Sequence, residues 1–98
     1  MTDARLPADL EPCGSTREFT AEDLPAALTS EHSLRAGRWG LLHLLEGEVV
    51  FVDLAGGGER TLRAPAQQLI EPERPHHLRP VGGPLRLRID FHERSATD

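Results

Sequence analysis

Glycine and proline interrupt this sequence so often after residue 33 that no long helix has room to form. Across its 98 residues the chain holds nine glycines and eight prolines. The intervening runs are short, and they are either apolar or alternate between apolar and polar, as in residues 39–45, 49–52 and 67–70. Runs of this length between turn-forming residues are typical of β-strands. About seven short strands in so small a chain predict an all-β domain, either a sandwich or a small closed barrel.

The segment near the end of the chain shows the strand pattern most clearly. Residues 85, 87, 89 and 91 are apolar, the three residues between them are charged, and His92 follows. Successive side chains of a strand point to opposite faces, so this alternation predicts one buried face and one polar face. The chain as a whole is expected to comprise a flexible arm over residues 1–12, one domain over residues 13–94 and a short tail over residues 95–98.

Charge and hydropathy exclude several classes of partner. The net charge is −5 and no dense basic run is present, so neither nucleic acid nor an anionic membrane is an expected partner. The first residues lack the charged and then apolar segments of a secretory signal, and no apolar run approaches the roughly 20 residues that span a membrane. We therefore expect a cytoplasmic protein.

The apolar run from Leu41 to Val52 bears on oligomeric state. It offers apolar side chains to both faces of a strand, whereas a single small barrel has one interior. The second face therefore predicts pairing with another copy across a two-fold axis, that is, a homodimer.

Five histidines are the main source of chemistry in this chain, because the sequence has no GxSxG, HExxH or CxxC motif. His32 stands just before the first long apolar run, and His76 stands where a proline-bracketed loop meets the next strand. Strand entries at one end of a barrel bring together side chains that are distant in sequence. Neutral imidazole is the commonest metal ligand, so these two histidines are candidate ligands. A solvated or hydrogen-bonded structural role is the alternative for each of them.

Several ordered segments between residues 13 and 92 resemble the TehB/YeaR-like domain family. Four segments, residues 32–40, 44–48, 70–78 and 89–91, resemble the family's H-x-T-K-x-G-x-W-G-K, V-L-x-G, V-E-P-x-x-W/P-H-x-V and I-x-F motifs. The chain departs from the first motif at its T-K, which is Leu34-Arg35 here. Members of this family are similar to cupins. The resemblance therefore implies a double-stranded β-barrel, or jelly roll, that is often paired into dimers. It also implies that His32 and His76 correspond to histidines of the family motif.

The chain departs from the general cupin pattern at its metal ligands. The first cupin motif contains H-x-H, but His32 is followed by Ser33 and Leu34, and Trp39 stands about where that motif has its glutamate. The second cupin motif keeps its histidine as His76. Two of the usual four ligands therefore match, and a divalent ion such as Zn, Fe, Ni or Mn needs water or a further side chain to complete its coordination.

Asp90 and His43 are weaker candidates for a third ligand. His43 lies among leucines, where a histidine is a core or interface residue or else points into the cavity. Asp90 shares a strand face with two arginines, which most simply indicates a solvated polar face. His77 is the weakest candidate, because it is adjacent to His76 and should point to the opposite face.

If His32 and His76 are surface ligands, replacing either with alanine should leave the free energy of unfolding of the metal-free protein nearly unchanged.

Three classes of function are compatible with this pattern. The first is a module that binds a metal, an oxyanion or another small molecule, and the resemblance links it to tellurite and oxyanion stress resistance. The second is a metal-dependent enzyme of the cupin kind, an oxygenase or isomerase, and the third is a domain for dimerisation or interaction. Where the family domain is fused to a methyltransferase, a Gly-rich loop of the other domain serves the methyl transfer. These 98 residues lack such a loop, so we expect them to catalyse no methyl transfer and consider a separate methyltransferase as a partner.

Overall fold

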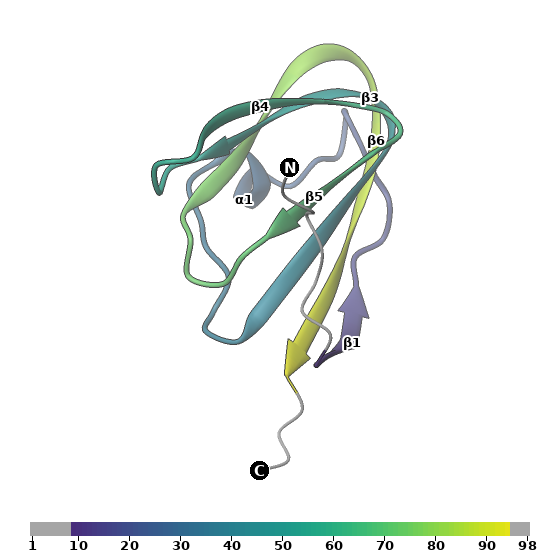
Figure 1. The fold of residues 1–98 in the computed structure, drawn as a ribbon. Helices are drawn as coiled ribbons and strands as arrows, with labels where there is room; N and C mark the ends of the chain where they lie inside the picture. Colours follow the sequence, from purple (N-terminus) through teal and green to yellow (C-terminus); the bar gives the residue numbers. More distant parts are fainter. Residues whose placement is uncertain (1–8, 95–98) are drawn as a thin grey trace.

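Strands make up most of the structure, and the helical content of residues 9–94 is a single turn. The computed structural model describes these residues, and Figure 1 shows their arrangement. The elements in chain order are β1 (Leu10–Ser15), β2 (Phe19–Thr20), α1 (Ala26–Thr29), β3 (Arg38–Asp53), β4 (Gly58–Arg63), β5 (Ala66–Ile70) and β6 (His76–Arg94). The all-β prediction is confirmed. No helix in residues 9–94 has the length and apolar character that crossing a bilayer requires.

β3 and β6 form the centre of one antiparallel sheet and pair along nearly their whole lengths. The strand order is β1-β6-β3-β4, with β2 also paired to β6 and β5 also paired to β3. β5 meets the first half of β3, and β4 meets its second half. Within residues 9–94 the pairing leaves β1 and β4 at opposite ends of this order, so it does not close a ring. The expected closed barrel is therefore corrected to an open, strongly bent sheet (Figure 1).

A bend in β3 stands where the sequence predicted a break between two strands. Residues 39–45 and 49–52 both belong to β3, and its pairing with β6 shifts register on either side of Gly47. Gly47 has a φ of 88°, a left-handed conformation that glycine adopts without steric penalty. A Cβ atom at this position would lie 2.0 Å from the carbonyl oxygen of Pro84 on β6. Glycine therefore lets the two strands bend together at close approach.

The concave side of the bent sheet holds an apolar cluster. Leu42 and Leu44 on β3 and Leu87 on β6 are at most 1% exposed. The alternation predicted for residues 85–91 is confirmed between Leu85 and Ile89, where the apolar side chains are buried and the arginines between them are half-buried. In the second half of β3, residues 49–52 are all at most 8% exposed. Part of the apolar run that predicted a dimer is therefore covered within a single chain.

β1 begins inside the segment that was expected to be a flexible arm. In the β1–β6 register, Leu10 lies opposite Arg94 and Pro12 lies opposite His92. Residues 10–12 are therefore part of the sheet. The rest of the expected arm, residues 1–8, and the expected tail, residues 95–98, lie outside the described residues.

Candidate functional site

His32 and His76 lie together because the backbone pairs at these two positions. The His32 amide donates to the His76 carbonyl oxygen at 3.0 Å, and the His76 amide donates to the His32 carbonyl oxygen at 2.9 Å. The two imidazole rings meet edge to face, with their centroids 4.2 Å apart. Two histidines that the sequence singled out independently thus form one cluster at the entry to β6.

Each of these imidazoles is oriented by a hydrogen bond to a backbone carbonyl two residues earlier. Nδ1 of His32 lies 3.0 Å from the Ser30 oxygen, and Nδ1 of His76 lies 2.8 Å from the Arg74 oxygen. A carbonyl oxygen can accept but not donate, so Nδ1 carries the proton in both neutral rings. Nε2 is then left with a free lone pair, which is the form in which histidine binds metals.

Nε2 of His76 is the most unusual atom of this cluster. The His76 residue is 3% exposed, and Nε2 is buried with no hydrogen-bond partner within residues 9–94. Leaving a buried acceptor unpaired costs about 1–3 kcal/mol. Burial is also the main influence that lowers the pKa of His76 below its ordinary value of 6.5, and the neighbouring His32 acts in the same direction, although the Arg74 carbonyl and Asp53 oppose it. At neutral pH this ring is therefore uncharged and its lone pair is available.

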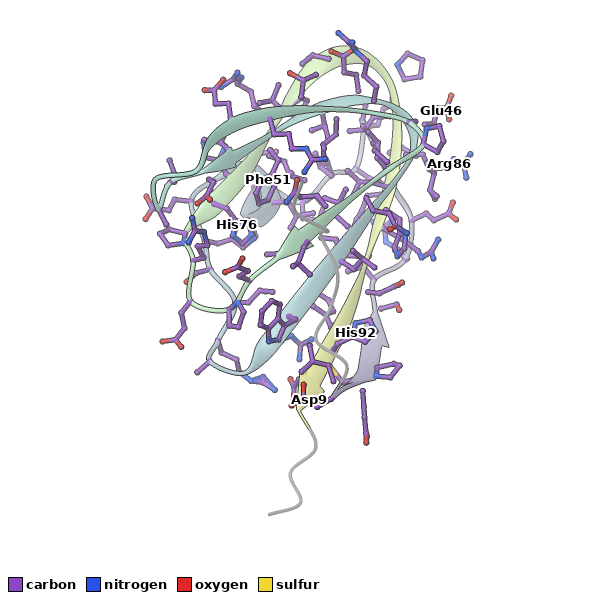
Figure 2. The ribbon with its side chains drawn as sticks, in the orientation of Figure 1. Asp9, Glu46, Phe51, His76, Arg86 and His92 are labelled. Atoms are coloured by element: carbon purple, nitrogen blue, oxygen red, sulfur yellow. The ribbon has the colours of Figure 1, made fainter. Side chains whose placement is uncertain are left out.

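A pocket of about 160 Å³ opens beside His76. Its walls come from β3, β5, β6 and the loop before β6, and they consist of Phe51, Asp53, Gln68, Leu69, Ile70, Glu71, Arg74 and His76. Phe51 stacks on the His76 ring with centroids 5.5 Å apart, and Figure 2 shows these two side chains next to each other. Drug-sized ligands usually occupy about 300–1,000 Å³. This pocket is suited to something smaller, such as a hydrated ion or a very small molecule.

Gln68, another residue of the pocket wall, carries a second unpaired acceptor and is not among the candidates that the sequence indicated. Its Oε1 atom is buried without a hydrogen-bond partner within residues 9–94, while its Nε2 donates to the Leu69 carbonyl oxygen at 2.8 Å. The available sequence signal was weak. Gln68 lies on the same face of β5 as Ala66 and Ile70. No metal-binding sequence motif includes a glutamine in a strand of this kind.

Asp53 and Arg74 form an ion pair in the pocket wall. Nε and Nη2 of Arg74 donate to Oδ2 of Asp53 at 3.0 Å and 2.8 Å, and the Ala55 amide donates to Oδ1 at 2.9 Å. Burial acts to raise the pKa of Asp53, but these hydrogen bonds and the Arg74 charge outweigh it and hold the pKa below 3.8. Both carboxylate oxygens are engaged, so Asp53 leaves the pocket with little free acceptor capacity of its own.

The weaker candidates from the sequence, His43 and Asp90, contact each other instead of the pocket. Oδ2 of Asp90 lies 2.8 Å from Nε2 of His43, and both residues alternate with core residues of β3 and β6, so they lie on the convex face of the sheet. His77 is half-buried on the face opposite His76, as alternation predicted. In the part of the chain that the structure describes, no three His, Cys, Asp or Glu side chains are close enough to hold one ion.

Known proteins with similar sequences or structures point to one family. The TehB-like domain family matches residues 14–89 of this chain. TehB from Haemophilus influenzae has a TM-score of 0.78 at 22% identity, over 89% of this chain and 32% of that chain. A protein from Escherichia coli strain K12 has a TM-score of 0.84 at 18% identity, over 93% of this chain and 97% of that chain. These TM-scores establish a shared fold, and this chain spans about a third of TehB. No protein of curated function matches the sequence significantly.

Proposed function

Because this chain belongs to the family of TehB-like domains, we propose that it is a small binding module whose pocket beside His76 holds a divalent metal ion. The observation that carries the proposal is the lone pair of His76 Nε2, which is buried and unpaired within the described residues. It lies next to the ring of His32, whose Nδ1 is likewise hydrogen-bonded to a backbone carbonyl oxygen. Evolution does not usually leave a buried acceptor unpaired without a function or a bound group. A metal ion would pair it.

The chemistry of the donors supports a borderline transition metal. Neutral imidazole nitrogen suits Zn, Fe and Ni, and Mn is more suited to oxygen ligands. The free lone pairs of His32 and His76 both belong to Nε2, and the Nδ1 hydrogen bonds to backbone carbonyls are the kind of support that metal-bound histidines receive. When bound, such an ion supplies Lewis acidity and exchangeable coordination positions. The chain itself orients the two rings and limits the size of what can enter.

The family resemblance implies a role in tellurite or oxyanion stress resistance. In this proposal the oxyanion binds to the metal ion and not directly to the side chains of the pocket. The unpaired atoms of the pocket, His76 Nε2 and Gln68 Oε1, are acceptors, and the Arg74 guanidinium beside them is engaged by Asp53. Acceptors repel a bare anion. An oxyanion would therefore bind as a further ligand of the ion. A separate methyltransferase remains a proposed partner on the same ground of resemblance.

Metal titration of the purified, metal-free protein tests the proposal. Calorimetry with Zn²⁺, Ni²⁺ and Mn²⁺ should detect one site per chain in the wild type. His32→Ala and His76→Phe should each weaken binding by at least about ten-fold, as expected for loss of a ligand. Phenylalanine is chosen at position 76 because the ring is buried against Phe51, so it removes Nε2 while filling the space.

His77→Ala is the matched control, since it removes an adjacent imidazole from the opposite face. It should bind metal like the wild type. Equal losses in all three variants would show non-specific binding by histidines, and a wild type that binds none of the three ions would refute the metal-site proposal.

A further inference from the structure

The geometry points to Gln68 as the third protein ligand of this site, through its amide oxygen Oε1. This inference rests on the proposed function and adds to it the identity of a ligand, and therefore the class of donor set: two imidazole nitrogens and one amide oxygen. The sequence candidates for that role, Asp90 and His43, lie on the other face of the sheet.

The position of Gln68 in the sheet directs its side chain inward. In the β3–β5 register it lies opposite Leu42, which is 0% exposed. Its neighbour on the same face, Ile70, is 4% exposed and belongs to the core cluster. Gln68 and His76 both line the pocket of about 160 Å³. An apolar residue would therefore suit position 68 for packing, and the amide calls for another explanation.

The amide is also held in one orientation. Its Nε2 donates to the Leu69 carbonyl oxygen at 2.8 Å. Rotating the amide by half a turn would place two acceptors, Oε1 and the Leu69 oxygen, against each other, so the network assigns Oε1 to the other side. That atom is the one that is buried without a partner.

Unpaired buried atoms are concentrated in this pocket. Within residues 9–94, three buried side-chain atoms lack a hydrogen-bond partner, and those of Gln68 and His76 belong to residues of the pocket wall. The third belongs to His92, which Figure 2 shows well separated from His76. The two pocket atoms are both acceptors, given the Nδ1 proton of His76. A shared cation pairs both at once, and the Co²⁺ titration below distinguishes it from a water molecule that donates one hydrogen to each acceptor.

The donor set predicts how the site behaves. Two imidazoles and an amide are all neutral, so a bound divalent ion keeps its full charge. Its remaining coordination positions are then open to water or to an anion from solution. Amide oxygen is a harder donor than thiolate, so the set favours Zn²⁺, Co²⁺, Ni²⁺ or Fe²⁺ over soft ions such as Cu⁺.

Titration of the metal-free full chain with Co²⁺, followed by its visible absorption, tests the inference. The spectrum reports the ligands and geometry of Co²⁺ itself, and a purely structural glutamine would not change it. We expect Gln68→Leu to weaken Co²⁺ binding by about ten-fold or more and to change the spectrum. Gln68→Glu should bind Co²⁺ at least as tightly as the wild type, because a carboxylate supplies the same oxygen with a negative charge.

Gln67→Leu is the control, since Gln67 is exposed on the neighbouring position of β5 and contacts His43 on the other face. It should leave the Co²⁺ affinity and spectrum unchanged. Gln68→Leu that binds Co²⁺ like the wild type, or a loss shared equally by both leucine variants, would overturn the role of Gln68 while leaving the two-histidine site intact. If Gln68→Leu fails to fold, weaker binding by Gln68→Glu overturns the role. No Co²⁺ binding by the wild type would instead overturn the proposed function.

Discussion

The two faces of the sheet each carry a histidine next to polar groups, yet their polar atoms are satisfied to different degrees. On the concave face, His76 Nε2 and Gln68 Oε1 are buried and unpaired within the described residues. On the convex face, His43 has a partner at both nitrogens, Asp90 at 2.8 Å and Gln67 at 3.3 Å. The hydroxyl of Ser15 and Nε of Arg88 donate to the other oxygen of Asp90, Oδ1.

Residue type and hollow size do not single out the pocket beside His76, whereas the unpaired acceptors of its wall do. A more open hollow of about 440 Å³ borders His43, larger than the pocket beside His76. Burial acts to raise the pKa of Asp90, but hydrogen bonds from Ser15, Arg88 and His43 hold it below its ordinary value of 3.8. The network around His43 and Asp90 is complete without a ligand, although Nδ1 of His92 on the same face is also buried and unpaired within residues 9–94. The pocket beside His76 has two such atoms among the residues of its wall, and it is the better candidate for binding.

The largest expected effect concerns the convex face, where the homodimer stays a prediction. Trp39, Leu41 and Leu45 alternate with buried residues of β3 and are half-buried in the single chain. Leu41→Arg places a charge at the centre of this face and should convert a dimer of two 10.8 kDa chains into a monomer, because interface cores exclude charge. Light scattering at micromolar concentration measures the mass. Leu54→Arg, in the exposed turn after β3, is the control, and a monomeric wild type would contradict the prediction.

The next largest effect is a difference in how much the loss of a histidine on each face destabilises the fold. His76→Ala should lower the free energy of unfolding of the metal-free protein by about 2–4 kcal/mol, because it leaves a cavity against Phe51. This corrects the sequence-based expectation of nearly unchanged stability, which assumed a surface position. His43→Ala should lower it by about 1 kcal/mol, since Asp90 keeps its other partners.

Urea unfolding of these variants measures the difference, with His77→Ala as a control expected within about 0.5 kcal/mol of the wild type. Metal affinity should stay unchanged in His43→Ala. If His43→Ala were as destabilising as His76→Ala, the convex network would be as essential to the fold as the buried ring.

The smallest effect is a change of stability with pH in the metal-free protein. The pKa of His76 is lower in the folded than in the unfolded chain, so the unfolded chain binds more protons between the two values. Stability should therefore fall as pH drops from about 6.5 towards the folded-state pKa. Asp53 and Asp90, whose pKa values are also lowered in the folded state, contribute stability above about pH 3.8 that is lost at more acidic pH.

Thermal midpoints measured from pH 8 to pH 3 separate the stability loss caused by His76, below about pH 6.5, from the loss caused by the two aspartates, below about pH 3.8. His76→Phe should remove most of the decline below about pH 6.5, and Asp53→Asn should reduce the loss at the acidic end. A wild-type midpoint that stays level between pH 7 and pH 5 would show that His76 is not held neutral by burial.

The sequence alone determined the features that depend on neighbouring residues. Alternation and Gly/Pro spacing predicted an all-β fold, and ordered motifs predicted the family, because side-chain period and turn chemistry are local properties. Alternation also separated His76 from His77 correctly. Residues 39–45 and 49–52, which the sequence predicted as separate strands, form one bent strand, because a glycine that ends a strand and one that bends it have the same local sequence signature.

Tertiary structure decided everything that depends on register between distant segments. The pairing of His32 with His76 sets two rings in contact, and the position of Gln68 opposite Leu42 puts this residue in the wall of the pocket that His76 also lines. Asp90 on β6 contacts His43 on β3, so it lies away from the pocket beside His76. The physical reason is that a shift of one residue in strand pairing moves every side chain to the other face, and the chain fixes that register only through the packing of the whole core.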